Sequence, residues 1–187
     1  MIGKKNIVFG FIYLVFTASL GLVMVDKYGA YNEAVSLKQQ SVGRLQQLKS
    51  EDFEEDLEAL SAEQIAKANT DGILAINQLI NAEAAIDIIK GGAHAHGNLE
   101  ALLNVAVGVI LCFIIAPPFI KQLISWIFIV GTLLHSGMLY LGRVFFMPWA
   151  ETVLSTGIGP GLLLLGLLAI GITAALRFQE NIIDDRN

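Results

Sequence analysis

Four stretches of the chain consist mostly of apolar and small residues and contain no Asp, Glu, Lys or Arg, and polar residues gather between the first stretch and the second. An α-helix rises 1.5 Å per residue, so about 20 residues cross the roughly 30 Å of hydrocarbon in a bilayer. Lipid offers no hydrogen bonds, so a helix must satisfy its own backbone groups there. The pattern therefore predicts four membrane-spanning helices, over residues 7–25, 101–120, 122–142 and 152–176.

The first stretch follows Lys4 and Lys5, a start that also resembles a secretory signal peptide. Its apolar run is longer than that of a signal sequence, and no clear cleavage site follows, so we expect a permanent anchor. With the N-terminus in the cytoplasm, Lys121 and Arg177 fall on the same side as the two lysines, as the positive-inside rule requires. This predicts a multi-pass protein of the cell membrane with both termini cytoplasmic.

Residues 26–92 carry most of the acidic side chains, are rich in helix formers and contain no proline. Ser50, followed by acidic residues, predicts one helix start, and Ser61 with Gln64 predicts another. We expect a small helical cap that lies outside the cytoplasm and rests on the membrane helices. Its acidic residues 51–58 are typical of a solvated face, with cation binding as the alternative. The chain is thus predicted to be all-α: a four-helix membrane bundle with a first membrane helix at 1–25, the cap at 26–92, and three membrane helices with a short cytoplasmic tail at 93–187.

Glycine and proline mark the breaks between the later helices. A glycine pair separates the cap from the second membrane helix, and a proline pair closes that helix just before the third begins. The fourth helix carries small residues that allow close helix packing, which favours a homo-oligomer, such as a trimer, or a place in a larger membrane complex. These residues are Gly91 and Gly92, Pro117 and Pro118, and then Gly157, Gly161, Gly166 and Gly171.

The composition agrees with a membrane protein. Hydrophobic residues make up 55% of the chain and charged residues 16%, with a mean hydropathy of +0.63, which excludes an ordinary soluble domain. A pI near 5.1 without a basic stripe argues against a nucleic-acid partner. Cys112 is the one cysteine, so a single chain builds neither a disulfide nor a cysteine zinc site.

All three histidines, His94, His96 and His135, lie in or beside the predicted membrane helices, where ionisable groups are costly and usually functional. His96, Glu100 and Asn104 are spaced four residues apart and share one helix face. His94 and His96 point about 200° apart on a helix, so only one of them reaches a given site, and we favour His96.

His135 lies on the next helix at a similar depth, with Ser136 and Tyr140 nearby. Two neutral imidazoles from facing helices are the usual axial ligands of a membrane b-type haem, whereas zinc would require a further ligand, for which Glu100 is the nearby candidate. The alternative is that these side chains only form hydrogen bonds within the bundle. The candidate cofactor-binding residues are His96, His135, His94, Asn104 and Tyr140, with His96 and His135 as the iron ligands.

Two short motifs resemble the styrene oxide isomerases, four-helix membrane enzymes that bind haem b between the subunits of a trimer. They are Ala95-His96 at the start of the second membrane helix and Gly159-Pro160-Gly161 at the start of the fourth. The resemblance implies that His96 takes the place of the haem ligand.

Other positions depart from that family. Leu102 stands where the family has an asparagine six residues after the ligand, and no acid precedes Tyr140. Epoxide isomerisation needs an open coordination position on the iron, which a second ligand from His135 would fill. We therefore expect a haem protein of electron transfer or sensing rather than an isomerase. A cofactor-free accessory subunit of a larger membrane complex is the other hypothesis.

Overall fold

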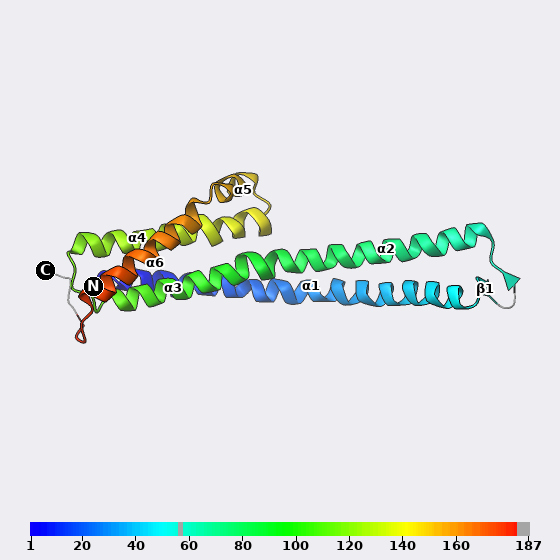
Figure 1. Ribbon diagram of the computed structural model, residues 1–187, viewed down its shortest axis with the longest axis horizontal. Helices are drawn as coiled ribbons and strands as arrows, with labels where there is room; N and C mark the ends of the chain where they lie inside the picture. Colours follow the sequence, from blue (N-terminus) through cyan, green and yellow to red (C-terminus); the bar gives the residue numbers. More distant parts are fainter. Residues whose placement is uncertain (56–57, 183–187) are drawn as a thin grey trace. The chain divides into compact units, whose positions relative to one another are not determined.

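The computed structural model describes residues 1–55 and 58–182 and is mostly helical (Figure 1). Among these residues, four helical stretches are long and apolar enough to cross a membrane, which confirms the helical fold class in its coarse form. They lie within Lys4–Ser50, Ala62–Leu111, Pro118–Val144 and Ile158–Arg177. The chain forms two compact units: a bundle unit of Met1–Gly21 with Ile88–Asn187, and a hairpin unit of Leu22–Asp87.

The hairpin unit consists of two long helices. Helix α1 (Lys4–Ser50) enters it at Leu22 and is followed by α2 (Ala62–Asp87). Between them lie the two-residue antiparallel strands β1 (Glu54–Glu55) and β2 (Glu58–Ala59). Small side chains allow α1 and α2 to meet: Leu45 lies against Gly72, and Ala34, Ala68 and Ala75 are buried.

One of the two predicted helix starts in this segment is wrong and the other is confirmed. Ser50 ends α1, and the acidic residues after it form a turn in which Asp52 and Phe53 have positive φ angles. No helix starts at Ser50, because α1 already extends without interruption from the first apolar stretch to this residue. At Ser61 the chain forms a capping box, in which Ser61 N donates to Gln64 Oε1 at 2.8 Å and Gln64 N donates to Ser61 Oγ at 3.2 Å.

In the bundle unit the second membrane helix is α3 (Ala95–Leu111), which follows the π-helical segment η1 (Ile88–His94). Non-helical backbone angles at Gly92 produce the expected break. Helix α3 ends nine residues before the predicted end at residue 120, because Ile114 pairs as a short β-bridge with Phe178 and Pro117 adopts an extended conformation.

The third membrane helix begins at Pro118, four residues before the predicted start at residue 122, because proline suits the first turn of a helix. It comprises α4 (Pro118–Thr132) and the π-helical segments η2 (Leu133–Gly137) and η3 (Tyr140–Val144). Lys121, which we expected to face the cytoplasm, lies within α4 and is fully buried.

The predicted fourth helix, over residues 152–176, is in fact two helices. A short α5 (Pro148–Ser155) is separated from α6 (Ile158–Arg177) by Gly157. Gly157 has a φ of +68°, a left-handed conformation that glycine adopts without strain and that ends a helix. The apolar pattern is continuous across this point, so the hydropathy alone did not reveal the break.

Helix α6 packs along α4, and a core of apolar side chains fills the contacts among α3, α4 and α6. Of the predicted small-residue surface of α6, Gly166 lies against α4, whereas a Cβ at Gly161 or Gly171 would meet no atom within 4 Å outside its own helix backbone. Gly159, which was not predicted, lies against η2. The core residues are Val107, Leu111, Ile114, Ile124, Phe128, Leu163 and Ile170.

Candidate functional site

Helix α3 carries the three polar residues that the sequence placed on one face. His96, Glu100 and Asn104 differ in burial: the His96 side chain is exposed, Glu100 keeps 3% of its surface and Asn104 keeps none. A carboxylate as buried as Glu100 needs partners, because a buried charge without them is strongly disfavoured. Those partners come from η2.

The Glu100 carboxylate is held by two consecutive residues of η2. Its Oε1 atom pairs with His135 Nδ1 at 2.5 Å, and its Oε2 atom accepts a hydrogen bond of 2.6 Å from Ser136 Oγ. Tyr13 OH lies 2.9 Å from Ser136 Oγ, which extends the network to α1. Neighbouring residues of an α-helix point about 100° apart. The wider π-helical winding of η2, a feature often found at functional sites, accompanies this convergence on one carboxylate.

The imidazole ring of His96 completes the group. Its centroid lies 4.8 Å from that of His135, with the ring planes at 65° in an edge-to-face contact. One potential ligand atom from each of His96, Glu100 and His135 lies within 4.8 Å of the other two. We call these three residues the His–Glu–His cluster. The two histidines predicted as a pair are therefore adjacent, and Glu100, predicted to share a helix face with His96, joins them.

The cluster has the donor set of a transition-metal site. Two imidazoles and one carboxylate are the ligands of facial-triad non-haem iron sites and resemble those of catalytic zinc sites. The same geometry does not fit His96 and His135 as the two axial ligands of one haem, because rings in edge-to-face contact leave no room for a porphyrin between them. The residues fit a haem iron with a single imidazole ligand, His96, since its side chain is exposed while His135 is held by Glu100.

Two other predicted site residues lie apart from the cluster. His94 has its Nδ1 atom 2.9 Å from the backbone oxygen of Thr17 and also contacts Asn98, so it ties η1 to α1. Tyr140 lines an apolar pocket of about 230 Å³ together with Tyr13, and its ring packs against Phe145. Neither residue contributes an atom to the His–Glu–His cluster.

Asn104 belongs to a buried polar network that joins three helices. Its amide nitrogen donates to Thr132 Oγ1 at 2.8 Å and to the Glu100 backbone oxygen at 3.0 Å, and its oxygen accepts a bond of 3.0 Å from Asn6. Asn6 in turn bonds to Ser125 of α4. These contacts use the hydrogen-bonding capacity of Asn104 and give it a role in helix association, as polar side chains commonly have between membrane helices.

The polar contacts that α1 makes with the other helices were not predicted. Asn6, Tyr13 and Thr17 all bond to polar groups of α3, α4 or η2, although the first apolar stretch was interpreted only as an anchor. A signal was present, because these residues are spaced by seven and four positions and so share one helix face. A polar stripe on an otherwise apolar membrane helix indicates a face turned away from lipid.

No protein-family model, curated protein or solved structure matches this chain. The resemblance to the styrene oxide isomerases therefore depends on the short motifs around His96 and Pro160 alone.

Proposed function

We propose that this chain is a membrane protein whose bundle unit binds iron through His96. The observation that carries the proposal is the convergence of His96, Glu100 and His135 within 4.8 Å in a bundle of apolar helices. Such a group is costly to place among apolar helices, and ionisable residues there mark functional sites by default.

The membrane topology is part of the proposal. Both termini lie in the cytoplasm, and the hairpin unit lies on the opposite side of the membrane. The lysines before the first apolar stretch, together with Arg177 after the last, support this orientation.

In the first form of the proposal, the iron belongs to a haem b that has His96 as its protein ligand. The exposed imidazole on the surface of α3 supports this form, as does the resemblance of Ala95-His96 to the haem ligand motif of the isomerase family. A haem on that surface would lie between copies of the chain, in a homo-oligomer such as a trimer. Bound haem would supply one-electron redox chemistry or the binding of a small gas, and hence electron transfer or sensing.

The ring contact also changes the case against epoxide isomerisation. His135 is held by Glu100 and does not serve as a second iron ligand in this geometry, so the argument from a filled sixth position no longer applies. Two differences from the isomerase family still disfavour epoxide isomerisation: Leu102 replaces the family's asparagine, and no acid precedes Tyr140. We therefore retain a redox or sensing role.

In the second form, the cluster holds a non-haem iron ion directly. The closeness of three ligand atoms favours this form, because a metal with bonds of about 2.1 Å requires only small movements of side chains that already meet. In this form Glu100 is itself an iron ligand, whereas in the haem form it only holds His135 by their ion pair.

The cofactor-free alternative also has support. Among the described residues, no buried side-chain polar atom lacks a hydrogen-bond partner, so the network is complete without a ligand. A subunit of this kind would use the cluster only to hold its helices together within a larger membrane complex.

Metal and haem analysis of the protein, purified from cells supplied with iron and haem, separates these forms. A Soret band and about one haem per chain, lost in His96→Ala and kept in His94→Ala, supports the haem form. Iron without a Soret band, lost in both His96→Ala and Glu100→Gln, supports the non-haem form. His94→Ala is the matched control because His94 lies just before the same helix but outside the cluster. Wild-type protein that contains neither haem nor iron overturns the proposal and leaves the accessory-subunit hypothesis.

A further inference from the structure

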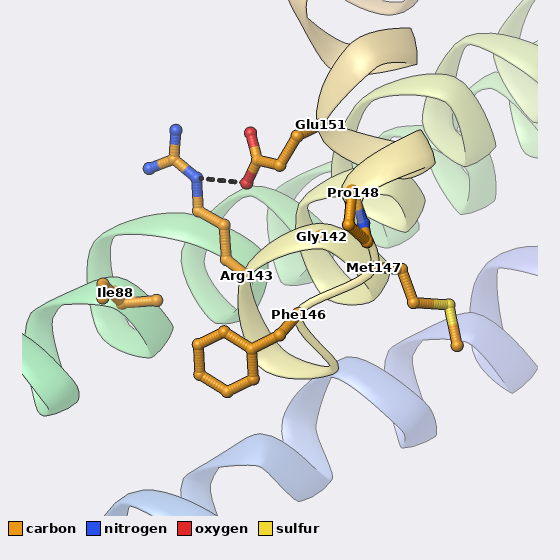
Figure 2. Close-up of a pocket in the computed structure, with 7 residues that line it drawn as sticks. All are labelled: Ile88, Gly142, Arg143, Phe146, Met147, Pro148 and Glu151. Carbon is orange, nitrogen blue, oxygen red and sulfur yellow. Dashed lines mark ion pairs between the residues drawn. The ribbon is translucent and has the colours of Figure 1, made fainter.

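A second site in the bundle unit lies where η3 turns into α5. Here a pocket of about 480 Å³ opens beside Arg143 and Glu151 (Figure 2). Its walls are otherwise mostly apolar and include Ile88, Phe146 and Met147. A volume in this range and an apolar lining with a few polar groups are typical of sites for small amphipathic molecules. The His–Glu–His cluster contributes no residue to this pocket.

The ion pair at the pocket uses only one nitrogen of Arg143 and one oxygen of Glu151. Arg143 Nε lies 3.3 Å from Glu151 Oε1, and each side chain is nearly half exposed, at 47% and 45%. Figure 2 shows that the two terminal guanidinium nitrogens and the second carboxylate oxygen point away from this contact. The site therefore offers hydrogen-bond donors with positive charge next to an acceptor with negative charge.

The backbone at Gly142 and Phe146 determines where the side chains of the pocket lie. Gly142 lies directly beneath Glu151, since a Cβ there would approach Glu151 Oε1 to 3.0 Å. Phe146 adopts a left-handed conformation with a φ of 55°, which is unfavourable for a residue other than glycine, and its side chain is 79% exposed. Phe145 and Trp149, close to it in the sequence, are also exposed, and exposed aromatic side chains are common at membrane surfaces.

From these observations we propose that the pocket binds one phospholipid whose head group carries a phosphate and a primary ammonium group. The phosphate binds the terminal nitrogens of Arg143, and the ammonium donates to the outer oxygen of Glu151. A purely anionic head group is disfavoured by Glu151, and a quaternary ammonium is disfavoured because it has no hydrogen to donate. The start of the acyl chains lies against Ile88, Phe146 and Met147. The proposal depends on membrane insertion of the chain but not on iron binding.

Quenching of Trp149 fluorescence by brominated lipids tests this site, because Trp149 follows Pro148, which lines the pocket. The full chain with Trp126→Phe, which leaves Trp149 as the sole tryptophan, is reconstituted into vesicles. The vesicles contain brominated phosphatidylethanolamine, phosphatidylcholine or phosphatidylglycerol at equal mole fractions. We expect the relative association constant of phosphatidylethanolamine at the site near Trp149 to exceed the constants of the other two lipids by roughly threefold to fivefold. A difference of this size corresponds to one partly exposed charge contact.

Two variants and one matched control make the result specific. Glu151→Gln should reduce the ratio of phosphatidylethanolamine to phosphatidylcholine binding to about one, and Arg143→Gln should weaken the binding of both lipids. Both variants should fold, because a half-exposed ion pair contributes little to stability. The control is Trp149→Phe, in which Trp126 reports on lipid next to Lys5 and should show no preference for phosphatidylethanolamine over phosphatidylcholine.

Equal quenching of Trp149 by the three lipids, or the strongest quenching by phosphatidylglycerol, overturns the site. Absence of quenching of either tryptophan by any lipid contradicts membrane insertion itself, which is a different failure.

Discussion

The contact between α1 and α3 in the bundle unit depends on glycine, and a single methyl group should disturb it. Gly3 just before α1, Gly10 of α1 and Gly108 of α3 lie where the two backbones meet. Close approach of membrane helices commonly uses such small residues. We predict that Gly108→Ala destabilises the bundle unit, although alanine is the better helix former.

The structure sets the size of the effect. A Cβ at Gly108 would lie 2.6 Å from the backbone oxygen of Gly3, 2.7 Å from Ile7 Cγ1 and 2.9 Å from Ile7 N. Two of these three atoms are backbone, so a side-chain rotation cannot relieve the overlap and the helices must separate. Overpacking of this kind costs about 1–3 kcal/mol.

The matched control is Gly171→Ala in α6, because a Cβ there would meet no other atom within 4 Å. The assay is unfolding of the purified protein in mixed micelles by increasing SDS, monitored by far-UV circular dichroism. Gly108→Ala should lower the free energy of unfolding by about 1–3 kcal/mol, and Gly171→Ala should leave it unchanged or raise it by up to about 1 kcal/mol. Equal stability of the two variants would refute the backbone contact between α1 and α3.

Two further predictions concern the polar contacts of each unit. Asn104→Leu removes the hydrogen bonds that Asn104 makes to buried Asn6 on α1 and Thr132 on α4 and should cost about 1–3 kcal/mol in the same assay. Asn77→Leu on the exposed surface of α2 should change stability by less than about 0.5 kcal/mol, and similar values for both variants would contradict the network. Ser61→Ala removes the capping box of α2 and should speed amide hydrogen exchange in its first turn by about fivefold, for a cap of about 1 kcal/mol. Ser50→Ala at the exposed end of α1 is the control, and unchanged exchange in Ser61→Ala would argue against the cap.

The coarse fold followed from the sequence because its signals are local. A charge-free run long enough to span the hydrocarbon layer specifies a helix wherever it occurs, and Ser61 marks a helix start through its own chemistry. The signals failed where an element depends on its neighbours. Ser50 resembles a helix start but ends α1, and the break at Gly157 is hidden within a continuous apolar pattern.

The part of the candidate site that depends on local spacing was predicted, and the part that depends on packing between helices was not. The spacing of His96 and Glu100 placed them on one face of one helix, and their neighbour His135 followed from its depth on the next helix. The ion pair between Glu100 and His135, and the contribution of Tyr13, depend on how η2 and α1 pack against α3. Helical periodicity within one segment does not specify that packing.

Rescue of His96→Gly by imidazole tests the role of His96 as an iron ligand most directly. The substitution removes the imidazole, and free imidazole added to the purified protein with iron or haem can replace the missing ligand. The account predicts that His96→Gly binds iron or haem at least about tenfold more weakly than wild type, since loss of one ligand contact of about 1.4 kcal/mol lowers affinity tenfold, and that imidazole restores the affinity. Iron or haem content equal to wild type in His96→Gly without imidazole would contradict the account.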